Sequence, residues 1–148
     1  MEKLKRLLNK YFWVLPILLA IPTGFALLKA GYFGASDDIH VAWLYEMERT
    51  ILAGQIPPRF VPDLSFGFGY PLFNFVFPLP FYLGEIFRLI GLSLVGSVKS
   101  VFFISLVLSS LTMYFFLKNF LGKHMALAGS LMYVYAPYRS TEVYVRGA

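Results

Sequence analysis

The chain has 148 residues, of which 58% are hydrophobic and only 14% charged, and its mean hydropathy is +0.66. A soluble domain of this length does not need so much apolar surface, so the composition indicates a protein whose solvent is lipid. The net charge of +5 comes from basic residues scattered at the ends of apolar segments, which argues against nucleic-acid binding, and the absence of cysteine excludes disulfides and thiolate metal sites.

The first apolar segment follows a basic N-terminus. Residues 1–10 carry four Lys or Arg side chains, and residues 11–28 carry no charge. This run is long enough to cross a hydrocarbon core, so we predict a first span at residues 11–29. A signal peptide is the competing interpretation, but the run is long for one and no small-x-small cleavage pattern follows. The positive-inside rule then places the N-terminus in the cytoplasm and the next loop outside.

The predicted outer loop covers residues 30–97 and begins with an amphipathic helix at about residues 38–54. Gly54 and two prolines end this helix, and Asp37 or Asp38 can cap its start. With its apolar stripe, the helix is expected to lie along the membrane surface. The stripe consists of Ile39, Trp43, Leu44, Met47 and Ile51.

The apolar segment at about residues 71–92 can be interpreted in two ways. Hydropathy alone predicts a span, but prolines, Asn74, Glu85 and Arg88 are costly in lipid unless they face protein or water. The alternative is a juxtamembrane or re-entrant helix of the outer loop, which agrees better with the charge rule. With that choice, residues 98–118 form the second span and residues 122–138 the third.

Asp37, Asp38 and His40 form the strongest local group of chemistry-bearing residues. On a helix that starts near Asp37, the carboxylate and the imidazole three residues later are neighbours. Such a pair could act as a general base or contribute to a divalent-cation site. The simpler interpretation is that one aspartate caps the helix while His40 packs within the apolar stripe. Local sequence alone leaves both interpretations open.

Besides His40, four further residues are candidates for substrate binding. Arg59 and Tyr70 belong to a loop rich in glycine and aromatic residues, a composition suited to close backbone approach and to the membrane interface. Arg139 and Arg146 follow the last apolar run and could hold an anionic, lipid-linked molecule. An interfacial arginine is also a common lipid-headgroup anchor, so each motif alone is a weak signal.

Taken together, the motifs resemble a known family. They occur in the order of an acidic residue near a histidine, Gly-x-x-Pro-Pro-Arg at 54–59, Phe-Gly-Phe-Gly-Tyr-Pro-Leu-Phe at 66–73, Ala-Pro-Tyr-Arg at 136–139 and Tyr-Val-Arg-Gly-Ala at 144–148. This order resembles the N-terminal part of the large bacterial and archaeal multi-pass membrane proteins of the 6-pyruvoyl-tetrahydropterin-synthase-related family, which are similar to GT-C glycosyltransferases.

The resemblance implies an all-α integral membrane protein with a GT-C-like N-terminal part, three spans and a long outer first loop that holds juxtamembrane helices. It also implies transfer of a sugar from a polyprenyl-phosphate donor at the outer face of the cell membrane, with Asp37 or Asp38 as the base or as the residue that positions the acceptor. We expect a single membrane domain over residues 1–148 that is part of a longer protein. A divalent cation is the one cofactor that this interpretation leaves open.

Two other classes of function compete with this expectation. A transporter or flippase of lipid-linked sugars would place ionisable groups near the bilayer midplane, and the uncharged runs at residues 11–28 and 101–117 do not. A non-catalytic membrane assembly subunit would need neither Asp37 nor Asp38. The sequence therefore favours an interfacial site in contact with membrane lipid.

Overall fold

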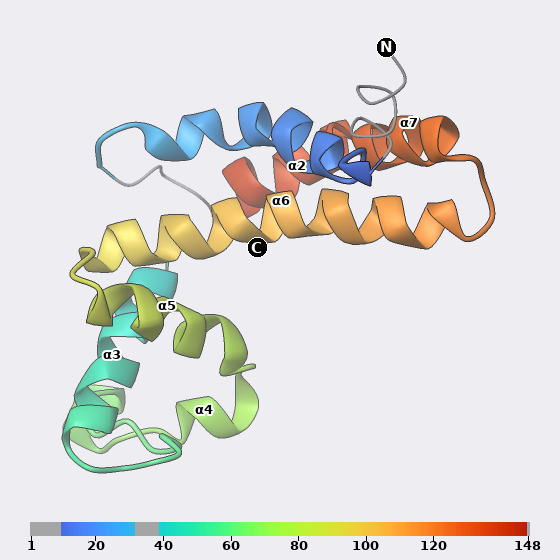
Figure 1. Ribbon diagram of the computed structural model, residues 1–148. Coiled ribbons are helices and arrows are strands. Elements are labelled where there is room, and N and C mark those ends of the chain that lie inside the picture. Colours follow the sequence, from blue (N-terminus) through green and yellow to red (C-terminus); the bar gives the residue numbers. More distant parts are fainter. Residues whose placement is uncertain (1–9, 32–38, 148) are drawn as a thin grey trace. The chain divides into compact units, whose positions relative to one another are not determined.

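The structure, a computed structural model, describes residues 10–31 and 39–147. Most of these residues are helical, and the extended pairing within them is a single antiparallel bridge (Figure 1). The chain divides into two compact units, residues 1–36 with 102–148 and residues 37–101. The second unit coincides closely with the loop predicted at residues 30–97. The division falls inside one long helix, between Val101 and Phe102.

That long helix, α6, runs from Leu94 to Lys118. At about 1.5 Å per residue its 25 residues extend roughly 38 Å, enough to cross a bilayer core. Within the described ranges it is the one helix that is both long and apolar enough to do so. It begins four residues before the predicted second span, because Leu94 to Val98 continue the same helical backbone into the second unit.

The predicted first span contains two kinds of helix. α2 is an α-helix over Val14–Ala20, and η1 continues it as a 3₁₀ helix over Ile21–Leu28. The change occurs next to Pro22, which has no N–H to donate and whose ring crowds the preceding turn. The apolar run is thus helical from Val14 to Leu28, and its second half is wound more tightly than an α-helix.

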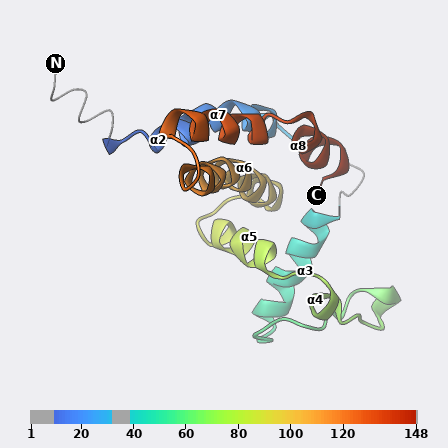
Figure 2. The same cartoon turned by 90° about the vertical axis from the view of Figure 1, so that its right-hand side faces the viewer.

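The third predicted span, residues 122–138, is also divided. α7 covers Lys123–Val134, α8 covers Pro137–Thr141, and η3 is a π-helix over Glu142–Arg146. Pro137 explains the boundary, because proline is disfavoured inside a helix but suits its first turn. In both cartoon views α7 lies alongside α2 (Figures 1 and 2), and the two helices are in contact.

Small residues bring the helices of the first unit close together. The ring of Phe103 on α6 lies against Gly24 of η1, so that a Cβ at position 24 would lie only 2.4 Å from Cδ2 of the ring. An apolar core surrounds this contact. A buried polar contact also joins two helices, because the Ser110 hydroxyl of α6 donates to the Pro16 carbonyl of α2 at 3.1 Å. The buried core residues are Ala20, Leu27, Leu106, Val134 and Val143.

Two helices form the base of the second unit. α3 covers His40–Leu52, within the predicted residues 38–54, and buries Leu44 and Met47 from the predicted stripe. α5 covers Leu79–Leu89 and packs on α3 so closely that a Cβ on Gly84 would lie 2.8 Å from a methyl group of Leu44. The contact explains why the stripe faces protein over part of its length.

The segment predicted as one helix at residues 71–92 is two helices in the structure. α4 covers Leu72–Phe75, the backbone is extended at Val76, and α5 starts at Leu79. Pro78 accounts for the break, because in a continuous helix it would have no N–H to donate to the Asn74 carbonyl and its ring would crowd that carbonyl. Before α4 lies a loop with a short 3₁₀ turn, η2, over Ser65–Gly67.

Candidate functional site

Asp37 and Asp38, the predicted catalytic residues, lie outside the described residues. Their neighbour His40 is the first residue of α3. Its imidazole packs edge-on against the Trp43 ring, with centroids 6.1 Å apart, and its centroid lies 6.3 Å from that of Phe81 on α5. His40 therefore packs among aromatic side chains of α3 and α5, and its part in substrate binding stays a prediction.

Arg59 and Tyr70, two predicted substrate-binding residues, lie on the loop between α3 and α4. The Arg59 side chain is exposed, and its backbone N–H donates to Oε1 of Gln55. Tyr70 exchanges two backbone hydrogen bonds of 2.8 Å with Val61, and its ring lies 6.2 Å from that of Phe75. Both residues therefore present polar side-chain groups on a loop whose backbone is fixed by hydrogen bonds.

A carboxylate and arginine cluster joins α3 to α5 and was not predicted as a site from the sequence. Arg88 donates from Nε and Nη2 to both carboxylate oxygens of Glu48, at 3.0 to 3.3 Å, and from Nη1 to the Leu92 carbonyl at 2.6 Å. Glu85 lies nearly one turn before Arg88 on α5, and its Oε1 is buried without a hydrogen-bond partner in the described structure.

The cluster leaves Glu85 poised to exchange a proton near neutrality. Burial is the main cause that raises its pKa to about 7, the negative charge of Glu48 raises it further, and Arg88 opposes the shift only in part. A carboxyl with such a pKa is suited to acid–base chemistry. In the sequence, Glu85 is the first charged residue after 21 uncharged ones, residues 64–84. From the sequence, this position indicated only that burying the carboxylate in lipid would be costly.

Glu46 is a second buried carboxyl of this unit. It is 9% exposed, its Oε2 has no hydrogen-bond partner within the part of the chain that the structure describes, and burial followed by the nearby Asp63 charge raises its pKa. Asp63 itself forms an exposed ion pair with Arg49. Glu46 does not belong to the predicted apolar stripe of this helix, yet it is buried, and Asp63 of the following loop is close enough to raise its pKa.

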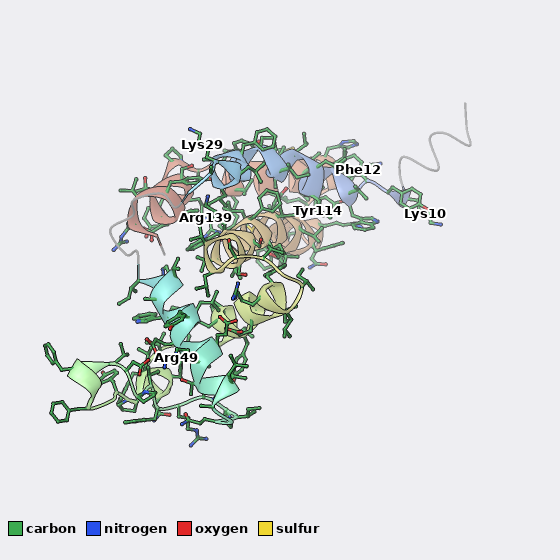
Figure 3. All side chains as sticks on the ribbon, turned by 90° about the vertical axis from the view of Figure 1, so that its left-hand side faces the viewer. Lys10, Phe12, Lys29, Arg49, Tyr114 and Arg139 are labelled. Atoms are coloured by element: carbon green, nitrogen blue, oxygen red, sulfur yellow. The ribbon has the colours of Figure 1, made fainter. Side chains whose placement is uncertain are left out.

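Arg139 is the most distinctive cation of the first unit. It lies in α8, shortly after the apolar helix α7, and its side chain is partly buried (Figure 3). Nη2 donates to the Ser109 hydroxyl at 3.4 Å, the guanidinium lies 5.2 Å from the centroid of the Tyr133 ring, and Nε is buried with no partner. Within the described residues, no carboxylate forms an ion pair with Arg139, although Glu142 is close enough to feel its charge.

Arg146, the other predicted arginine, differs from Arg139 in having a carboxylate partner. Its Nη1 lies 2.8 Å from Oε1 of Glu142, one turn earlier in the π-helix η3. This hydrogen bond is the first cause of the lowered pKa of Glu142. Since the Arg146 side chain is 61% exposed and already paired, Arg139 is the better placed of the two to bind an added anion.

The described residues hold no cluster of three or more His, Asp or Glu side chains that could bind a metal ion. A scan against models of known protein families gives no match, and comparisons with curated proteins and with solved structures give none either. The relation to GT-C glycosyltransferases therefore remains a prediction from the sequence motifs.

Proposed function

We propose that the chain forms part of a GT-C-like membrane glycosyltransferase that transfers a sugar from a polyprenyl-phosphate-linked donor at the outer face of the membrane. In this proposal the N-terminus is cytoplasmic, and residues 11–29, 98–118 and 122–138 cross the membrane. Residues 30–97 then form an outer unit that carries juxtamembrane helices. The observation that carries the proposal is the environment of Arg139.

A guanidinium that lies next to an apolar helix, partly buried and without an ion-pair partner among the described residues, is poorly compensated. An anionic oxygen beside the partly exposed Arg139 side chain would balance its charge. A phosphate attached to a polyprenyl chain fits such a site, because its charge lies at headgroup depth while its tail stays in lipid. Arg139 follows the apolar α7 by five residues, which suits that depth.

The chemistry requires a base for the acceptor hydroxyl, and the family resemblance assigns this role to Asp37 or Asp38. Both precede α3 in the proposed outer unit. A transporter of lipid-linked sugars would bind the same donor, so binding alone does not separate it from an enzyme. A variant that still binds the donor but no longer transfers the sugar would separate the enzyme from the transporter.

The first experiment measures binding of polyprenyl phosphate to the chain in nanodiscs of zwitterionic lipid. Arg139→Gln is expected to weaken binding roughly tenfold to hundredfold, because a hydrogen bond to a charged group contributes about 1.5 to 3 kcal/mol. Arg146→Gln is the matched control, since that arginine already has a carboxylate partner. Equal affinity in the wild-type protein and Arg139→Gln would contradict the assignment.

The second experiment measures transfer and transport by the full-length protein in proteoliposomes that contain radiolabelled polyprenyl-phosphate hexoses. We expect the Asp37→Asn and Asp38→Asn double variant to bind polyprenyl phosphate normally and to lose transfer. Transfer retained in the double variant overturns the catalytic assignment. Movement of the labelled donor between leaflets without any transfer favours the transporter instead.

A further inference from the structure

The loop that precedes α4 carries exposed phenylalanine rings. Phe66 and Phe68 are 104% and 88% exposed, and after α4 begins Phe75 and Phe77 are 74% and 67% exposed. Soluble surfaces rarely gather so many large apolar side chains within one short stretch. The four rings define the aromatic loop, residues 60–77.

The backbone of the aromatic loop holds two of these rings outward. Val61 and Tyr70 close its base with two hydrogen bonds of 2.8 Å, and the Gly69 N–H donates to the Leu64 carbonyl at 2.9 Å. Phe66 has φ of +59°, a left-handed conformation that is unfavourable for a bulky side chain. A strained phenylalanine with a fully exposed ring indicates a contact that the isolated chain does not provide.

The Phe60 ring of the aromatic loop packs against the loop's own backbone at Gly69. The Phe60 ring occupies the space where a side chain at position 69 would lie, so that a Cβ on Gly69 would come within 2.1 Å of Cζ. Gly69 also has φ of +81°, which favours glycine. The loop therefore packs Phe60 against its own backbone while Phe66 and Phe68 face away from it.

The absence of charge in this stretch and its short connection to α6 indicate that the exposed rings contact lipid. Residues 64–84 contain no charged side chain, so nothing in this stretch opposes entry into an apolar phase. The stretch cannot cross a membrane as one helix, because the backbone between α4 and α5 is extended. Only residues 90–93 separate α5 from α6, the helix long and apolar enough to span, which keeps α5 near the membrane surface.

We propose that the aromatic loop inserts the Phe66 and Phe68 rings into the interfacial region of the lipid bilayer. The loop then anchors the second unit at the membrane surface independently of the spanning helices. The rings gain an apolar environment, and the hydrogen-bonded base of the loop remains paired within the protein. This inference holds whether the chain is an enzyme, a transporter or an assembly subunit.

The absence of cysteine allows a direct test by site-directed spin labelling. Single-cysteine variants Phe66→Cys and Phe68→Cys are labelled and reconstituted into vesicles of phosphatidylethanolamine and phosphatidylglycerol. The measurement compares collision of the label with oxygen, which concentrates in lipid, and with a water-soluble nickel complex. Both substitutions remove rings that are almost fully exposed, so the fold should tolerate them.

Two further positions calibrate the measurement. Leu108, 50% exposed in the middle of α6, reports lipid, and Asn119, exposed in the turn after α6, reports water. We expect an oxygen-to-nickel collision ratio at positions 66 and 68 that is several-fold above that at 119 and close to that at 108. A water-like ratio refutes the proposal. Low collision with both reagents shows that protein covers the rings, and it refutes the proposal equally.

Discussion

Replacing Glu85 by glutamine tests whether the carboxylate and arginine cluster destabilises the fold at alkaline pH. In the folded chain burial, aided by the charge of Glu48, raises the pKa of Glu85 to about 7 from an ordinary value of 4.5. Arg88 offsets the raised pKa only in part, because its guanidinium is engaged by both oxygens of Glu48 and by a backbone carbonyl. The folded protein therefore favours the protonated carboxyl.

The sign and magnitude of the effect follow from these two pKa values. Because the folded-state pKa is the higher one, the contribution to stability is complete below about pH 4.5 and is lost as the pH rises through 7. The difference of 7 − 4.5 = 2.5 units corresponds to about 3 kcal/mol, and partial solvent exposure lowers this to about 2 kcal/mol. Glutamine cannot ionise, so Glu85→Gln should be more stable than the wild type by that amount at pH 8.

Thermal unfolding in nanodiscs, followed by tryptophan fluorescence, measures this difference. Trp43 packs edge-on against Phe81 of α5, so in a Trp13→Phe background it reports on the α3 and α5 contact. We expect Glu85→Gln to raise Tm by roughly 8 °C at pH 8 and to change it little at pH 4.5. A Tm difference that is independent of pH, or a less stable variant at pH 8, would refute the reasoning.

Two other pairs of substitutions test the packing within each unit by thermal unfolding. Arg88→Gln should lower the stability by about 2 kcal/mol because it leaves a partly buried carboxylate unpaired, whereas Arg49→Gln, from an exposed ion pair, should cost less than about 1 kcal/mol; equal losses would contradict the role of burial. Gly24→Ala should cost about 1 to 3 kcal/mol because its Cβ meets the Phe103 ring, whereas Gly122→Ala, with nothing within 4 Å, should change stability little. A neutral Gly24→Ala would show that the helices separate at no cost.

Local patterns predicted the helices well, and the prolines explain where the prediction differed. The periodic stripe on residues 38–54 predicted α3 within two residues at each end, because Gly54 and the prolines after it limit the helix. The apolar segment predicted at about residues 71–92 as a juxtamembrane or re-entrant helix divides into α4 and α5, with an extended residue at Val76 between them. The prolines that counted against a span in the sequence also explain the division, because Pro78 has no N–H for the Asn74 carbonyl and its ring crowds that turn.

The site was less predictable, because its electrostatics depend on residues far apart in the chain. Glu48 and Arg88 are 40 residues apart, and only the packing of α3 on α5 brings them together and leaves Glu85 without a cation of its own. Likewise, Arg139 and Arg146 are equivalent in sequence terms, and the spacing of Glu142 and the contact with α6 distinguish them. Asp37 and Asp38 remain candidates from the sequence alone.

At Pro22, where α2 changes to η1, the fold supplies a hydrogen bond that the sequence alone does not predict. In the 3₁₀ turn the N–H of residue 22 would pair with the carbonyl of Leu19, and proline has none. The Tyr135 hydroxyl, 116 residues away, donates to that carbonyl at 2.8 Å, and the Tyr144 hydroxyl donates to the carbonyl of Thr23. The Tyr135 hydroxyl thus supplies to the Leu19 carbonyl the donor that Pro22 lacks, and this donor would be needed wherever water cannot reach the helix.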